Sequence, residues 1–311
     1  MAPASQVPAW FDGAVLERPP DVTDDEVLGL VRRLWEPRAD AVEHLAVGWG
    51  AHHWRVDVDG EPALFLTLDP DLPRHTQATL EAAYASAASL DLPFVWPSLP
   101  SLDGTFTAPL GARTTSVTGW LEGTRPEESV AELPDLLADL HAAPAPASAR
   151  AWSTEIPSDL PALLRSLLQQ PWTGPLGPAA HELLVEHLTT VGGWAREHAR
   201  LVALADPSTY VVTHGEPHVR NQWLARGRTW LVDWESLLLA PRERDLATLV
   251  HEGRDVDHDR QMVRLFDLEW RLSEIWSFAQ WLQGPHVGDT DDHTALGGLT
   301  EELTRPHFGT A

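Results

Sequence analysis

The chain has 311 residues, of which 43% are hydrophobic, and 22 basic residues stand against 46 acidic ones, a net charge of −24 at pH 7. This length accommodates two lobes or one large domain, and the apolar content is that of a globular protein, which excludes extensive disorder. The absence of cysteine excludes disulfides, thiolate metal sites and cysteine nucleophiles. All 22 basic residues are arginine, because the sequence contains no lysine, so any mechanism that needs a lysine is excluded in its standard form.

The net negative charge also indicates which kinds of molecule the protein can bind. So negative a field repels nucleic acid and anionic membranes and attracts a cationic small molecule or peptide. An acidic, well-solvated surface encoded by GC-rich codons accounts for the same charge. No run approaches eighteen apolar residues, and the N-terminal stretch lacks the basic start and apolar run of a secretory signal. We therefore expect a cytoplasmic protein, a monomer or homodimer, that binds neither nucleic acid nor membranes.

The first third of the chain has the pattern of a small sheet. Residues 41–68 predict three strands, because "HHWRVDV" and "PALFLTL" alternate in polarity and a "DG" turn joins them. Residues 74–90 are alanine-rich with helical spacing, and two more strands are predicted near 105–110 and 113–121. This order indicates an antiparallel sheet with one helix.

The rest of the sequence is mostly helical in pattern. Apolar stripes predict helices around residues 133–140, 184–202 and 262–283. The proline-, alanine- and serine-rich stretch 143–161 is typical of a surface connection.

Residues 213–223, "THGEPHVRNQW", concentrate polar side chains between two strand patterns. The segment "QWLA-RG-RTWLVDW" follows and predicts a hairpin with a tight turn at Arg226-Gly227. Asp233 ends the second strand of this hairpin. We therefore expect Glu216, Asn221 and Asp233 to lie close together.

Three interpretations fit this cluster. A zinc site from His214 and His218 would need a helix, which Pro217 disfavours. If the segment is only a polar turn, its histidines would form hydrogen bonds with backbone groups. A phosphotransferase loop would need a carboxylate to orient the attacking hydroxyl and oxygen ligands for Mg²⁺, which Asn221 and Asp233 supply.

The segments "VVTHGEPHVRNQWL", "WLVDWE" and "APRERDLATLV" together resemble the aminoglycoside phosphotransferase family, a small-molecule branch of the protein-kinase fold. That family's catalytic loop commonly reads H-G-D-x-H-x-x-N, and its metal-binding strand ends as I-D-W or I-D-F. "GWLEGTRP" and "LLADLHAAP" extend the resemblance more weakly, to about residues 40–285. The resemblance implies an α+β, bilobal protein-kinase-like fold, with an antiparallel-sheet N-lobe over 1–121 and a mostly helical C-lobe over 122–311.

The resemblance also implies roles for residues. Glu216 would be the catalytic carboxylate, with His214 beside it more as a buttress than as a reacting group, and Asn221 and Asp233 would bind Mg²⁺. Glu235 would hold the metal's water shell or a cationic substrate. The other positions that the resemblance implies are, for the nucleotide, Gly48, Gly50, His53, Arg55, Thr67, Val117 and Trp120, and, for support of the loop, His218 and Asp245. The acidic charge of the chain, rather than the resemblance, makes further side chains of the C-terminal region available to a cationic substrate: Glu269, Glu274, Asp289, Asp291 and Asp292.

The sequence departs from the family pattern at two positions, the catalytic carboxylate and the phosphate-binding lysine. Glu216 replaces aspartate, and an extra methylene moves the carboxylate by about 1 Å, a misplacement that costs on the order of 10²-fold in rate unless the backbone compensates. The phosphate-binding lysine of the third strand is missing; Thr67 stands near its position, and Arg55 or His53 would have to reach in. Glu81, the usual partner of that lysine, is expected to be exposed.

These features predict an ATP- or GTP-dependent, Mg²⁺-dependent phosphotransferase that acts on a hydroxyl of a small cationic molecule, such as an aminoglycoside-like antibiotic. A tailoring kinase for a biosynthetic peptide is a related alternative. The competing class is a pseudokinase-like binding module that keeps the fold without the chemistry.

Overall fold

The computed structural model describes residues 18–47, 50–69 and 75–308. It divides into two compact units, which we call the sheet unit (residues 18–152 and 206–252) and the helical unit (residues 153–205 and 253–308). The polar segment 213–223 groups with the sheet. The lobe boundary expected at residue 121 falls inside the sheet unit and stays a prediction.

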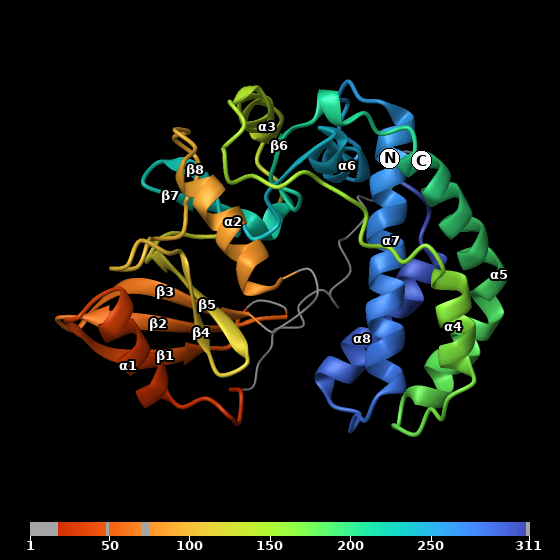
Figure 1. Cartoon of the computed structure of the whole chain (residues 1–311), viewed down its shortest axis with the longest axis horizontal. Coiled ribbons are helices and arrows are strands. Elements are labelled where there is room, and N and C mark those ends of the chain that lie inside the picture. Colours follow the sequence, from red (N-terminus) through yellow and green to blue (C-terminus); the bar gives the residue numbers. More distant parts are fainter. Residues whose placement is uncertain (1–17, 48–49, 70–74, 309–311) are drawn as a thin grey trace. The chain divides into compact units, whose positions relative to one another are not determined.

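A five-stranded antiparallel sheet in the order β1-β2-β3-β5-β4 forms the framework of the sheet unit (Figure 1). Its strands are β1 (Ala39–Leu45), β2 (His52–Val58), β3 (Glu61–Asp69), β4 (Thr107–Leu110) and β5 (Arg113–Gly119). The β2–β3 turn has positive φ at both Asp59 (54°) and Gly60 (81°), as a two-residue hairpin turn requires. The predicted strands are thereby confirmed.

The two faces of this sheet have different neighbours. Trp54, Val56 and Leu66 lie in a buried core with residues of α1 (Asp24–Leu34). Because side chains alternate along a strand, residues such as Thr67 and Asp69 point to the opposite face. Helix α1 was not predicted from the sequence, although its Thr23–Glu26 capping box is a recognisable helix start.

Helix α2 (Gln77–Ala88) confirms the predicted helix, but the expectation that Glu81 is exposed was wrong. The Glu81 carboxylate accepts hydrogen bonds from the backbone N–H groups of Phe106 and Thr107 and from the Thr107 hydroxyl at 2.6 Å. Glu81 therefore fastens α2 to the start of β4, where backbone donors would otherwise lack acceptors.

The rest of the sheet unit supplies the polar loop and its supports. Two short antiparallel pairs, β6 (Val211–Thr213) with β9 (Leu238–Ala240) and β7 (Gln222–Ala225) with β8 (Arg228–Leu231), surround the 3₁₀ turn η3 (Val219–Asn221), and a further 3₁₀ turn, η2 (Pro207–Thr209), precedes β6. Helices α3 (Leu133–Ala142) and α6 (Glu243–His251) complete it. The predicted hairpin turn is confirmed, with φ of 53° at Arg226 and 72° at Gly227.

The expected surface connection over 143–161 was wrong at its centre. The Trp152 N–H donates to the Leu239 carbonyl at 2.7 Å, and only 7% of Trp152 is exposed. Leu160, near the end of the stretch, is the first residue of a helix. Proline content alone did not reveal that the large apolar side chain of Trp152 would be buried.

The helical unit consists of α4 (Leu160–Leu168), α5 (Gly177–Val202), α7 (Arg260–Gln283) and α8 (Thr290–Thr304) (Figure 1). Their apolar faces meet in one core that includes Leu164, Leu184 and Ile275. Helix α8 approaches α7 so closely that a Cβ on Gly298 would lie 2.6 Å from the Phe278 ring. Helices α4 and α8 were not predicted.

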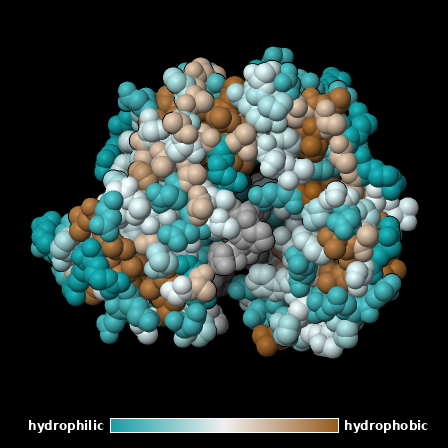
Figure 2. Space-filling view, viewed as in Figure 1, coloured by the Kyte–Doolittle hydropathy of each residue, from teal (hydrophilic) through white to brown (hydrophobic). Residues whose placement is uncertain are grey.

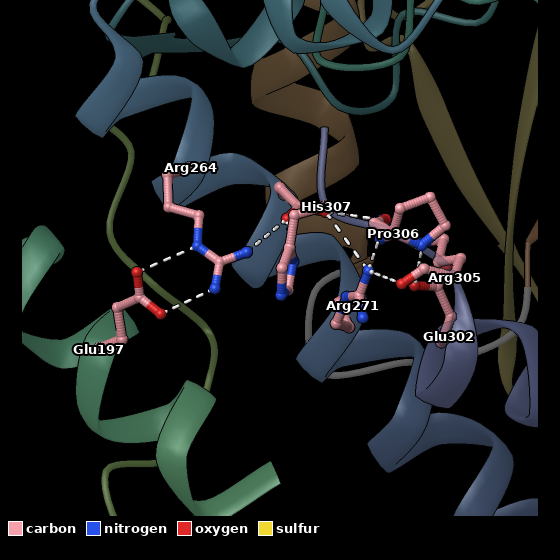
Figure 3. Close-up of polar contacts among 8 residues, drawn as sticks. Glu197, Arg264, Arg271, Glu302, Arg305, Pro306 and His307 are labelled. Carbon is pink, nitrogen blue, oxygen red and sulfur yellow. Dashed lines mark hydrogen bonds and ion pairs between the residues drawn. The ribbon is translucent and has the colours of Figure 1, made fainter. Parts of the chain in front are cut away.

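A buried ion network ties this unit together (Figure 3). Asp267 on α7 accepts hydrogen bonds from Arg264 (3.0 Å), Arg305 (2.7 Å) and His307 (2.7 Å). Arg264 also binds Glu197 of α5 at 2.8 Å. Burial alone would raise the pKa of Asp267, but the charges and hydrogen bonds of Arg305, Arg271 and His307 together outweigh it, and the pKa is lowered. The network thus fixes the chain end after α8 by paired charges.

Hydrophilic residues are spread widely over the face seen in Figure 2, as the composition leads one to expect. In the described part of the chain, no helix combines the length and the apolarity that crossing a bilayer demands.

Candidate active site

The polar loop begins where β6 ends, and Asp245 of α6 fixes its backbone. The Asp245 carboxylate accepts from the N–H groups of His214 (3.1 Å) and Gly215 (2.6 Å) and contacts His141 Nε2 at 2.9 Å. Gly215 has φ 97°, and a Cβ there would collide with the guanidinium of Arg244. The Asp245 carboxylate therefore fixes the loop backbone at His214 and Gly215, and the positive φ favours glycine at position 215.

His214 is a support rather than a reacting group in this geometry. Its Nδ1 accepts from the Glu216 N–H at 3.3 Å, so its Nε2 carries the proton and donates to the Val232 carbonyl at 2.9 Å. The side chain is fully buried, and burial lowers its pKa to about 4. His214 is thus neutral and links the loop to the segment after β8.

Glu216 and Asn221 lie together on this fixed backbone. The Asn221 amide donates to the Glu216 carbonyl at 2.9 Å, and no hydrogen bond to its Oδ1 occurs among the described residues. The Glu216 carboxylate accepts from the Ser236 hydroxyl at 3.2 Å and lies 3.6 Å from His218 Nε2. The Asn221 side chain is therefore tied to the backbone of Glu216.

Asp233 follows β8 with φ 67°, an unusual conformation for a residue with a side chain. Its carboxylate reaches solvent, yet it is so crowded by protein that desolvation raises its pKa to about 6, with a second contribution from the charge of Glu216. The structure thus brings Glu216, Asn221 and Asp233 together. Their oxygens fit the ligand preference of Mg²⁺.

A second acidic group lies next to these residues, and of its three members only Glu235 was a candidate from the sequence. Asp69 at the end of β3, His75 and Glu235 each offer a ligand atom within 4.8 Å of the others. Burial, then the charge of Asp233, raises the pKa of Asp69 to about 7. Burial raises the pKa of Tyr84 on α2, and the charge of Asp69 adds to this shift. Asp69 was recognisable as a carboxylate two residues beyond Thr67 on the same strand face.

The model of the phosphotransferase enzyme family (APH) matches residues 41–282. The chain belongs to this family. The match covers the sheet, the polar loop and most of the helical unit, so the family membership concerns both units.

Two solved structures are similar to this family member over nearly its whole length. One is spectinomycin phosphotransferase APH(9)-Ia in complex with ADP and spectinomycin, with 13% identity and a TM-score of 0.69 over 90% of this chain and 94% of that one. The other is its AMP-bound complex, with 12% identity and a TM-score of 0.66 over 92% and 96%. These likenesses show the bilobal, protein-kinase-like α+β fold that the sequence predicts.

Protein StrN of Streptomyces griseus is 35% identical over 96 residues. The match spans 30% of this chain and 30% of that protein, so it covers less than a third of the curated relative.

Some of the residues predicted to bind the nucleotide lie close to one another. His53 Nδ1 lies 3.2 Å from the Thr67 hydroxyl, and its ring stacks on Phe65 with centroids 4.9 Å apart. Trp120 lies 6.4 Å from the same Phe65 ring. Phe65, which was not among the residues predicted from the sequence, therefore joins these aromatic side chains on one face of the sheet.

Val117 and the loop glycines, which were also predicted to bind the nucleotide, are not part of this aromatic group. Val117 is fully buried in the core with α1, and its carbonyl accepts from the Leu99 N–H at 2.7 Å. Gly50 has φ 81°, as expected of a glycine turn, and Gly48 lies outside the described residues. Adenine contact by this segment stays a prediction.

Arg55 is paired within the sheet. Its guanidinium binds Asp57 at 2.8 Å and Glu43 at 2.9 Å. Both carboxylates would have to release it before it could serve as the substitute for the missing lysine.

The acidic residues predicted to bind substrate lie in the helical unit, apart from Glu235. Glu269 accepts from the Thr154 hydroxyl at 2.9 Å and contacts His198, and Glu274 is half-buried on α7. The expectation that Asp292 is available was wrong, because it is buried and accepts from Trp281 Nε1 at 2.8 Å. It also forms a capping box with Asp289 at the start of α8.

Proposed function

We propose that this chain transfers the γ-phosphoryl group of ATP or GTP, with Mg²⁺, to a hydroxyl of a small cationic molecule of the aminoglycoside class. The observation that carries this proposal is the gathering of Glu216, Asn221 and Asp233 on a backbone fixed by His214 and Asp245. It builds on membership in the phosphotransferase enzyme family.

The chemistry divides among these residues. Glu216 orients the acceptor hydroxyl and takes its proton as the new O–P bond forms and the bond from the γ-phosphorus to the bridging oxygen breaks. Asn221 Oδ1 and the Asp233 carboxylate would hold Mg²⁺, which offsets phosphate charge when bound. Ser236, which donates to Glu216, keeps the longer side chain aimed at the acceptor.

The acceptor class rests on charge and likeness. The net charge of −24 favours a cationic molecule, since a negative field raises its local concentration. The similar APH(9)-Ia structure holds spectinomycin, and this supports an amine-bearing cyclic alcohol as acceptor.

The test is transfer of labelled γ-phosphate to a panel of aminocyclitols, aminoglycosides, choline-like amines, nucleosides and serine- or threonine-containing peptides. We expect transfer to an amine-bearing alcohol, lost in Glu216→Gln and Asp233→Asn and kept in Glu186→Gln, which changes an exposed residue of α5. A peptide as the sole acceptor would identify a tailoring kinase instead. No transfer to any acceptor, with Mg²⁺ or Mn²⁺, would overturn the proposal.

A pseudokinase-like binding module is the second candidate, and two observations favour it. The chain has no lysine, and Arg55 is paired with Asp57 and Glu43. A calorimetric titration with Mg-ADP separates the two candidates. Our proposal expects binding by the wild type and a change below about threefold in Arg55→Ala, because threefold corresponds to under 1 kcal/mol and Arg55 serves the sheet. Absence of binding by the wild type would favour the pseudokinase.

A further inference from the structure

The acidic group next to the proposed Mg²⁺ position has the composition of a metal site. Asp69, His75 and Glu235 come from the end of β3, the segment before α2 and the loop after β8. His75 Nε2 lies 3.8 Å from Glu235 Oε1, and ligand atoms of all three residues lie within 4.8 Å of one another. Three side chains from separate segments thus converge on one point.

One atom of this group points to a ligand independently of the clustering. Asp69 is 1% exposed, and its Oδ2 is buried without a hydrogen-bond partner in the described residues. An unpaired buried carboxylate oxygen costs several kcal/mol in a folded protein, by the general cost of removing a charge from water. A bound cation removes this cost, because it supplies the missing partner.

The position of the group matters for phosphate binding. Asp69 lies two residues beyond Thr67 on the same face of β3, and Glu235 lies two residues beyond Asp233. In this chain without lysine, carboxylates therefore stand where a positive charge would face the phosphates. Carboxylates alone would repel a triphosphate.

We propose that Asp69, His75 and Glu235 bind a divalent cation of the Mn²⁺ or Zn²⁺ type, separate from the ion at Asn221 and Asp233. One imidazole and two carboxylates suit these ions, whereas Mg²⁺ prefers oxygen ligands alone. The ion replaces the charge of the missing lysine; this role rests on the proposed function, but the binding site itself does not.

The test is Mn²⁺ binding to the full chain without nucleotide, followed by calorimetry and by pulsed electron paramagnetic resonance. We expect a bound Mn²⁺ whose spectrum shows coupling to an imidazole nitrogen. His75→Gln should abolish this coupling, and Asp69→Asn should weaken Mn²⁺ binding at least about tenfold, as expected for a lost ligand. The matched controls are His293→Gln and Asp91→Asn, which change exposed residues.

The outcomes separate this proposal from the proposed function. The second site would be overturned if Mn²⁺ bound to the wild type shows no coupling to nitrogen. It would also be overturned if Asp69→Asn binds Mn²⁺ with unchanged affinity, and either result would stand even if phosphoryl transfer is found. Nitrogen coupling in a chain that transfers no phosphate would support the site and overturn the function. The wild-type spectrum decides the question even if His75→Gln does not fold.

Discussion

The two histidines of the polar loop differ in what their nitrogens contact. Both nitrogens of His214 are bonded to backbone groups, whereas His218 has a buried Nδ1 without a partner in the described residues and an Nε2 3.6 Å from Glu216. His214 therefore fixes the loop backbone, whereas His218 lies beside the Glu216 carboxylate. In the proposed function, Glu216 is the residue on which the chemistry depends.

Shortening Glu216 tests whether the loop is built for the longer side chain. We expect Glu216→Asp to lower kcat by about 10- to 100-fold, because the carboxylate retreats by about 1 Å from the acceptor and from Ser236. Glu216→Gln should cost about 10²- to 10⁴-fold, since it removes the proton acceptor. Steady-state kinetics with the best acceptor measure both, with Glu186→Gln as control. Equal rates in Glu216→Asp and the wild type would contradict the first expectation.

The buried His53 side chain leads to a prediction of how the stability of the fold depends on pH. Burial lowers its pKa to about 4 from 6.5, so the unfolded chain binds a proton that the folded chain does not between these values. Its contribution to stability is complete above pH 6.5 and is lost as the pH falls toward 4. Asp69, whose pKa is raised to about 7, acts in the opposite sense over the same range.

The variant His53→Gln should therefore lose less stability than the wild type on acidification, by about 2 kcal/mol between these pH values. Urea denaturation across this range measures the free energy of unfolding. His293→Gln, at an exposed position of α8, should follow the wild type. A parallel decline in wild type and His53→Gln would show that His53 is protonated in the folded state.

At the scale of elements, short segments are held by side chains that come from elsewhere. Asp245 of α6 holds the turn after β6, Glu81 of α2 holds the start of β4, and Asp267 of α7 holds the segment after α8. Asp245 and Glu81 accept from backbone N–H groups of these short segments, whereas Asp267 accepts from the side chains of Arg305 and His307. These contacts keep in place segments that are too short to be stable alone.

Removing Asp267 should loosen the end of the helical unit. Asp267→Ala leaves Arg305 and His307 without their shared carboxylate, and we expect a loss of about 3–5 kcal/mol in the free energy of unfolding. Hydrogen exchange should also rise at residues 305–308, since their anchor is gone. Asp255→Ala, at an exposed site in the same unit, is the control. A loss below about 1 kcal/mol would show that the network contributes little.

At the scale of the whole molecule, the charge of −24 without any lysine sets the field that a substrate meets. Such a field attracts cations over a distance of about 10 Å at 0.1 M salt and is screened at higher salt. For the proposed function, this field would favour a cationic acceptor and disfavour a nucleotide that arrives without its metal.

This field predicts a salt dependence that differs between acceptors. The KM for an amine-bearing acceptor should rise several-fold as the salt concentration goes from about 0.05 to 0.5 M, because screening weakens long-range attraction. The N-acetylated form of the same acceptor, which lacks the charge, should show a change below about twofold. Initial-rate kinetics over a salt series measure both. A KM that rises equally for the two forms would assign the effect to the nucleotide or the protein.

The sequence by itself determined the features that depend on local pattern. Strand alternation, the Asp59-Gly60 and Arg226-Gly227 turns and the spacing from His214 to Asn221 concern residues close along the chain, and the predicted strands and hairpin are confirmed. Family motifs added the protein-kinase-like fold. These features were predictable because neighbouring residues limit backbone conformation before any packing occurs.

Only the tertiary structure decided which side chains are paired and which converge. The hydrogen bonds of Glu81 with Thr107 and the meeting of Asp69 with Glu235 depend on segments far apart in the sequence. Each residue type is compatible with solvent exposure, so composition gave no sign of these contacts. Burial alone makes them matter, because a carboxylate removed from water must find a donor, a proton or a cation.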